Sequence, residues 1–162
     1  MGMETQGSVT GGVLYRPGAA ADLLLAIQLR AEMSEDMGHP FDDRSPHWRQ
    51  AYQDYFKPRL EEGSARFFFA FVDDAAIGSL VASVADHYRT ALFGTIYGQI
   101  NSVYVRRAFR RRGIGTALMR HAIAWLESRG SHVVRLRASE EGRLVYEKMG
   151  FTSTNEMELR LS

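Results

Sequence analysis

The amino-acid sequence predicts a single mixed α/β domain, in which helices pack on the faces of a mixed sheet. Its 162 residues, 45% of them hydrophobic, suit one hydrophobic core. The hydrophobic period changes from helical to strand-like after residue 62, and a strong helical stripe follows at 114–126. The expected order of elements is therefore β-α-α-β-β-β-α-β-α-β.

The first third of the chain is expected to form one strand and two helices. A short strand at 13–16 is ended by a Pro-Gly pair. Helix-forming residues predict helices at 19–33 and 46–62. Pro58 should kink the second helix or end it early, because proline lacks the amide N–H of the helical ladder.

Three strands are expected next. Aromatic residues at 66–73 and apolar residues at 76–86, joined by the turn Asp73-Asp74, predict a hairpin. After a polar loop, a long strand is expected at 96–105. Beyond residue 130 we expect three more elements: a strand at 132–137, a helix at 139–149 and a strand region at 151–161.

The strongest helix lies between these groups of strands and is ended by Gly130. Its apolar side chains recur at i, i+3, i+4, i+7, i+8, i+11 and i+12, which places them on one face. This stripe consists of Ile114, Ala117, Leu118, His121, Ala122, Trp125 and Leu126. A histidine within such a stripe is expected to be structural rather than catalytic.

The composition excludes several classes of protein. With no cysteine, the chain has no disulfide framework, no cysteine-ligated metal site and no cysteine nucleophile. The longest apolar runs, at 67–72 and 77–85, are far shorter than the ~18 residues of a membrane span, so no membrane partner is expected. Residues 1–12 are polar and glycine-rich, which predicts a flexible tail and not a signal peptide. We therefore expect one domain over 13–162 in a cytoplasmic protein.

A cluster of arginines stands out against a net charge of only +1. Arginine supplies 18 of the 20 basic residues, and six of these lie between Arg106 and Arg120. In this stretch a strand ends, a basic loop follows, and Gly113 and Gly115 open a helix. Free N–H groups and the dipole at a helix N-terminus favour an anion, most naturally a diphosphate. The loop lacks the lysine of a Walker motif, and Leu118 replaces the third glycine of a dinucleotide fingerprint. The alternative is a solvated arginine loop.

Two motifs resemble one known family. Arg110-Arg111-Arg112-Gly113-Ile114-Gly115 resembles the Arg/Gln-x-x-Gly-x-Gly/Ala signature of the GCN5-related N-acetyltransferases (GNAT). The segment from Ser139 to Phe151, with Tyr146 inside it, is similar to the family's C-terminal helix and Gly-Phe turn. The resemblance extends over 13–161. It implies a mostly antiparallel sheet of six to seven strands flanked by about four helices.

The resemblance implies that acetyl-coenzyme A (acetyl-CoA) donates an acetyl group to a primary amine, or sometimes an alcohol. It places Ser139 near the pantetheine arm, although a serine there also suits a helix N-cap. Gly142 could leave room for the thiol arm. The resemblance assigns the remaining contacts to the backbone of Val103, Tyr104 and Val105 and to the pyrophosphate segment Arg110, Arg111, Arg112, Gly113, Ile114, Gly115 and Thr116. It also makes a homodimer a reasonable expectation.

The chemistry of acyl transfer adds constraints. Without cysteine no acetyl group can be carried on sulfur, which favours direct attack of the amine on the thioester. An amine with a pKa near ~10 must first lose a proton, and the leaving thiolate benefits from a proton donor. The resemblance assigns that role to Tyr146, which we also expect to contact the cofactor; the alternative is a tyrosine packed at the sheet edge.

The general base is harder to assign. Family members often have a glutamate at the position of Gln99 or of Asn101, and neither of these amides can act as a base. Strand alternation places both on the same face as Val103 and Val105, where they would hold a water or orient the amine. The candidate carboxylates are Glu32, Glu35, Asp36, Asp42 and Asp43, which are individually typical of a solvated loop and together suggest a cationic acceptor.

Some alternatives remain open at this stage. His39, His47 and His87 share no ligand spacing, so no metal is expected. Aromatic residues could line an acceptor pocket or simply pack the second helix: Tyr15, Trp48, Tyr52, Tyr55 and Phe56. The domain could also be a non-catalytic acyl-CoA sensor, or could bind nucleic acid through its arginine run, although the neutral net charge disfavours a nucleic-acid partner.

Overall fold

The computed structural model describes residues 7–38 and 45–161, and these form a six-stranded mixed sheet with its strands in chain order. The first five strands are antiparallel to their neighbours, and the last pair is parallel. This arrangement confirms the predicted fold class. The strands are β1 (Ser8–Thr10), β2 (Val13–Gly18), β3 (Ala65–Val72), β4 (Ala75–Ala85), β5 (Tyr97–Val105) and β6 (Val133–Arg135).

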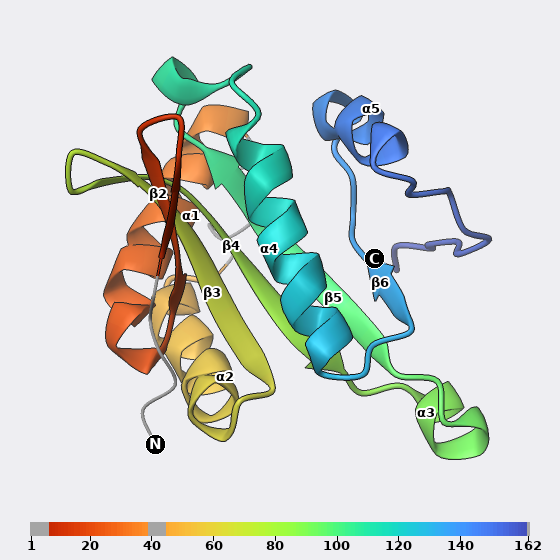
Figure 1. Cartoon of the computed structure of the whole chain (residues 1–162). Coiled ribbons are helices and arrows are strands. Elements are labelled where there is room, and N and C mark those ends of the chain that lie inside the picture. The colour runs from red at the N-terminus through yellow and green to blue at the C-terminus, as the bar shows by residue number, and fades with distance from the viewer. Residues whose placement is uncertain (1–6, 39–44, 162) are drawn as a thin grey trace.

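Helices cover both faces of the sheet (Figure 1). The α-helices are α1 (Leu23–Met37), α2 (Trp48–Glu62), α3 (Tyr88–Phe93), α4 (Ile114–Ser128) and α5 (Glu140–Lys148), with short 3₁₀ turns at Ala20–Asp22 and Arg107–Phe109. Helix α4 lies on one face, and α1 and α2 lie on the other (Figure 1). None of the described helices is long and apolar enough to cross a bilayer.

Strand alternation divides the core into two layers. In β3, Phe68 faces α4, whereas Phe67 and Phe69 face α1 and α2. The stripe predicted for α4 is confirmed, because Leu118 and Leu126 are fully buried in the first layer. His121 lies at the exposed edge of this stripe, with its Nε2 3.4 Å from Ser8 Oγ.

Two differences from the sequence predictions concern the ends of the chain. The flexible tail predicted for residues 1–12 is wrong at residues 8–10, because these form β1 and pair with β2. The turn between the two strands lies at Gly11 and Gly12, which both have positive φ. The strand expected at 151–161 is also absent, since these described residues pair with no neighbouring strand. Their alternating pattern is compatible with a strand, but a strand needs a partner edge.

Two further differences concern helices. Pro58 does not end α2, which continues to Glu62; Phe56 and Leu60 are buried against the sheet on either side of it, and this packing outweighs the lost hydrogen bond. The loop before β5 contains α3, capped by His87, whose Nδ1 accepts from Arg89 N at 3.2 Å. A helix of six residues is too short for periodicity to reveal.

Candidate active site

The sheet opens between β5 and β6. These strands pair only from Tyr97 to Gln99, opposite Val133 to Arg135. Strand β5 then continues six residues further, to Val105, while the chain after β6 turns away toward α5 (Figure 1). The C-terminal part of β5 therefore has β4 on one side and, in the described structure, no strand on the other.

A β-bulge at Ser102 changes which face the β5 side chains occupy. Ser79 lies opposite Tyr104 and Val81 opposite Asn101, so β5 has one residue more than β4 between these pairs. Ser102 takes up the extra length with φ +56°, which is uncommon for a residue other than glycine. Its hydroxyl accepts a hydrogen bond from Arg30 Nη1 on α1.

We predicted that the side chains of Gln99 and Asn101 share one strand face with those of Val103 and Val105. This prediction is wrong because of the bulge. Asn101 lies opposite Val81, which belongs to the core layer of α1 and α2. Val103 and Val105 pack against the layer of α4. Gln99 and Asn101 consequently lie on the α1 and α2 face, with Gln99 Nε2 3.4 Å from Asn101 Oδ1.

The backbone of Val105 is directed toward the opening. Arg106 N donates to Ile77 O in β4 at 2.8 Å. Since successive residues of an antiparallel strand point their amide groups to opposite sides, the N–H and C=O of Val105 face away from β4. Its carbonyl accepts from Arg110 Nε at 2.8 Å, and its N–H points into the opening.

The first turn of α4 lies beside this end of β5. Gly115 stands next to Val105, because a Cβ built on Gly115 would lie 3.8 Å from Val105 Cγ2. The N-cap residue Gly113 has φ +76° and offers no side-chain cap, and Arg111 has φ +64°. The exposed guanidinium groups of Arg111 and Arg112 add positive charge to the helix dipole. Such backbone turns expose several N–H groups toward one anion.

Two of the candidate carboxylates are engaged in ion pairs with the basic loop. Glu32 receives two hydrogen bonds from Arg106, at 2.7 and 2.8 Å. Asp36, one turn later on α1, accepts from Arg110 Nη2 at 3.0 Å and from the Tyr104 hydroxyl at 2.8 Å. The hydrogen bond from Arg106 lowers the pKa of Glu32, which makes this carboxylate a weaker base. Glu35 is exposed, and Asp42, Asp43 and His39 lie outside the described residues.

The pKa of Tyr104, in contrast to that of Glu32, is raised by its surroundings. Desolvation, followed by the hydrogen bond to Asp36, raises the pKa of Tyr104 to about 12. Tyr104 therefore remains a hydrogen-bond donor at neutral pH, and its side chain anchors α1. Together, Arg106, Arg110 and Tyr104 attach the end of β5 to α1.

Tyr146 lies half-buried on α5, with its ring 5.9 Å from that of Phe151 in an edge-to-face contact. Desolvation raises the pKa of its hydroxyl, so Tyr146 is protonated at neutral pH. A Cβ on Gly142 would stand 3.0 Å from Cε2 of the tyrosine ring. The glycine thus makes room for the ring of Tyr146, and the space expected for a thiol arm stays a prediction. Ser139 caps α5, its Oγ accepting from Gly142 N at 3.1 Å.

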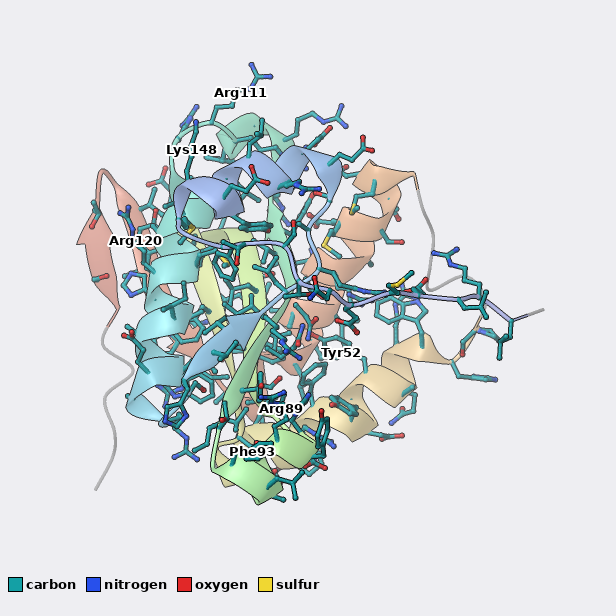
Figure 2. All side chains as sticks on the ribbon, turned by 90° about the vertical axis from the view of Figure 1, so that its right-hand side faces the viewer. Tyr52, Arg89, Phe93, Arg111, Arg120 and Lys148 are labelled. Atoms are coloured by element: carbon teal, nitrogen blue, oxygen red, sulfur yellow. The ribbon has the colours of Figure 1, made fainter. Side chains whose placement is uncertain are left out.

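A cavity of about 640 Å³ lies between α4 and α5. It begins at Thr116 in the first turn of α4, and two basic side chains, Arg120 and Lys148, border it. Figure 2 shows both along one side of the molecule, with Arg111 above them. Arg120 belongs to the arginine cluster recognised in the sequence. Lys148, one of only two lysines, lies inside the second motif and was not predicted as a site residue.

The aromatic residues considered for an acceptor pocket mostly pack the core. Phe56 is buried in the layer of α1 and α2, and Tyr15 is buried in the layer of α4, on the opposite face of the sheet. Tyr52 packs between Trp48 and Phe56, with ring centroids 6.4 and 4.6 Å away, and burial raises its pKa. Among the described residues no group of three metal-ligating side chains gathers.

Comparison with known proteins identifies the family and the fold. The model of the acetyltransferase (GNAT) family matches residues 29–151. The chain belongs to this family. A GCN5-related N-acetyltransferase from Ralstonia eutropha JMP134 is 29% identical, with a TM-score of 0.79 over 93% of this chain and 99% of the other. A predicted acetyltransferase with acetyl-CoA from Clostridium acetobutylicum is 26% identical, with a TM-score of 0.81 over 93% and 96%.

More distant structures share the GNAT fold. Glucosamine-6-phosphate N-acetyltransferase from Arabidopsis thaliana is 16% identical, with a TM-score of 0.69 over 92% of this chain and 97% of the other. No curated protein matches the sequence. The family match over residues 29–151 confirms the resemblance to the GNAT acetyltransferases.

The ion pair between Glu32 and Arg106 should stabilise the fold in a pH-dependent way. Because the pKa of Glu32 is lowered in the folded state, its contribution is present above the unfolded value near 4.5 and is lost as the pH falls through the folded value. Both side chains are about 30% exposed, so we expect Glu32→Gln to cost only about 1–2 kcal/mol of unfolding free energy at pH 7. Urea unfolding at pH 7 and below pH 4 measures this difference, which should shrink at the lower pH.

The exposed Glu35 on the same helix provides the matched control. Glu35→Gln should leave the unfolding free energy nearly unchanged at both pH values. A loss for Glu32→Gln that stays constant across the titration would mean that the ion pair does not stabilise the fold.

Proposed function

We propose that this GNAT-family chain transfers the acetyl group of acetyl-CoA to a primary amine of a small molecule or a peptide, by direct attack within a ternary complex. The observation that carries the proposal is the opening between β5 and β6, where the N–H of Val105 points beside the uncapped first turn of α4. A donor fixed in that position would stabilise the oxyanion of acyl transfer.

The residues of the α4 side fit a coenzyme A molecule. Arg111 to Thr116 present N–H groups and positive charge to a pyrophosphate. Beyond Thr116, the cavity between α4 and α5 offers Arg120 and Lys148 to further phosphate groups. Acetyl-CoA would supply an activated thioester, and the similar Clostridium acetobutylicum protein was crystallised with that molecule. Arg110 contributes indirectly, since Asp36 and Val105 O engage its guanidinium.

The amine would approach from the α1 and α2 face. There the amides of Gln99 and Asn101 are positioned to hold a water or orient the amine nitrogen. As the nitrogen bonds to the carbonyl carbon, its proton passes to water. The carbon–sulfur bond then breaks, and the Tyr146 hydroxyl donates a proton to the leaving sulfur. The tyrosine recovers its proton from solvent, so the step is balanced in atoms and electrons.

A second candidate function is acyl-CoA binding without catalysis. It is favoured by the two amides on β5 and by the ion pairs of Glu32 and Asp36, because these two carboxylates of α1 are already engaged with arginines. The acidic residues of this region suggested a cationic acceptor. The ion pairs weaken that suggestion, because they neutralise Glu32 and Asp36 within the protein. They also weaken nucleic-acid binding, since Arg106 and Arg110 are neutralised internally.

The proposed function predicts both binding and turnover. Acetyl-CoA should bind in a calorimetric titration, and thiol release should continue steadily with at least one member of a panel of primary amines. Binding without thiol release for any amine would support the sensor. Absence of binding would contradict both functions.

Replacing Tyr146 tests the proton donor. Tyr146→Phe keeps the ring that packs on Phe151 and removes only the hydroxyl, so we expect kcat to fall about 10²-fold while the Kd of acetyl-CoA changes less than about twofold. Because the pKa of Tyr146 is raised above 10, its ionisation should not lower kcat below pH 10. Tyr88→Phe, on the exposed α3, is the control; unchanged turnover in Tyr146→Phe would remove this residue from catalysis.

A pair of isosteric substitutions at Gly113 tests the pyrophosphate site. A Cβ on Gly113 would meet no protein atom within 4 Å, and Asn and Asp both tolerate positive φ and cap helices. Gly113→Asp should therefore remain folded but bind acetyl-CoA at least about tenfold more weakly than Gly113→Asn. The difference between the two Kd values should shrink as salt is added, because salt screens the charge of the aspartate. Equal Kd values for the two variants in calorimetry would place the pyrophosphate elsewhere.

A further inference from the structure

Strand β6 places one arginine beside the proposed amine site. Arg135 is paired with Gln99 of β5, in the last pair before the two strands separate (Figure 1). Paired residues of neighbouring strands project to the same face of the sheet. The chain neighbours of Arg135, Val134 and Leu136, pack in the layer of α4, so Arg135 lies on the opposite face, toward α1 and α2. It therefore lies at the closed end of the opening, on the face from which the amine would approach.

An aromatic ring holds the guanidinium of Arg135 in place. Its Cζ lies 4.5 Å from the ring centroid of Tyr97, a buried residue of β5. The ring of His87, at the N-cap of α3, packs on the same tyrosine with a centroid distance of 4.3 Å. A ring attracts the positive charge but leaves the N–H donors of a guanidinium without strong acceptors. Arg135 is therefore oriented by packing while its donors stay available to a ligand.

The charge of Arg135 is not matched by a carboxylate in the described part of the chain. Its Nε is buried and donates to no acceptor there, and none of the ion pairs between described residues includes this arginine. By contrast, Arg106 and Arg110, just beyond the other end of β5, each bind a carboxylate of α1. A half-buried cation with an unsatisfied donor costs free energy, which an anionic ligand would offset.

We propose that the amine acceptor also carries a carboxylate, and that Arg135 binds this group. The inference rests on the proposed function, which places the thioester near Val105 and the amine on this face of β5. A planar guanidinium matches a carboxylate, with which it forms two parallel hydrogen bonds. From Gln99 to Val105 the strand advances six residues, or about 20 Å. The acceptor would lie along β5, with its amine toward Val105 and its carboxylate at Arg135.

Calorimetric titration of alanine peptides into the protein with saturating coenzyme A tests this inference. Peptides of about two to six residues, each made as C-terminal acid and as C-terminal amide, share one terminal amine and span up to about 20 Å. At one length or more, the acid should bind at least about tenfold more tightly than the amide, because only the acid forms charge-assisted hydrogen bonds. Equal Kd values at every length, or no peptide binding, overturn the inference. Coenzyme A carries no acetyl group, so this result is independent of thiol release from acetyl-CoA, which tests the proposed function.

Variants of Arg135 assign the effect to this side chain. Arg135→Gln should weaken binding of the peptide acid about tenfold and change binding of the amide less than about twofold. Arg135→Lys keeps the charge but not the planar fork, so its loss for the acid should be smaller. Arg137→Gln is the matched control, because this side chain is 85% exposed and also carries one positive charge. Unchanged acid binding in Arg135→Gln, or an equal loss in Arg137→Gln, overturns the inference.

Discussion

The attachment of the β5 end to α1 is the constraint on which the candidate site depends. Glu32 and Asp36, one turn apart on α1, hold Arg106, Arg110 and the Tyr104 hydroxyl, all more than 60 residues away in the chain. Arg110 also donates to the carbonyl of Val105, so the same side chain fixes the backbone that faces the opening. These contacts determine where the basic loop starts, and hence where the first turn of α4 lies. Part of the arginine cluster therefore builds the site, while Arg111 and Arg112 remain exposed at its surface.

The bulge at Ser102 gives the opening two different sides. Without the extra residue, Gln99, Asn101, Val103 and Val105 would share one face, and groups for the coenzyme and for the amine would compete for the same space. With it, the valines lie toward α4 and the amides toward α1 and α2. In the proposed reaction, coenzyme and amine then meet at the gap from opposite faces. A single inserted residue thus gives the opening the two different faces that the proposed direct transfer uses.

Hydrophobic periodicity and turn-forming residues could predict most of the fold, because these signals are local in the sequence. The stripe of α4 and the β3–β4 hairpin follow directly from spacing and turn residues, and Gly113 and Gly115 marked the helix start that faces the opening. The bulge could not be predicted, since one extra residue leaves no mark on a strand of mixed polarity. The ion pairs of Glu32 and Asp36 were equally hidden, because sequence alone does not show which of several acidic residues meets an arginine 74 positions away. The strand expected at 151–161 shows the remaining limit: alternation describes a surface, and only a partner edge makes it a strand.

The distribution of protons around the opening follows from the same contacts. Arg106 keeps Glu32 ionised but occupies its oxygens, so the charge of this carboxylate stabilises the loop and is not available to an amine. Burial keeps Tyr146 protonated, which suits a donor and not a base. The side-chain amides of Gln99 and Asn101 are neutral and do not act as bases. In the proposed reaction the amine loses its proton to water, and the protein contributes by orienting that water and by protonating the sulfur. In that reaction Tyr146 assists departure of the thiol, whereas Gln99 and Asn101 act on the amine only by orienting it or a water.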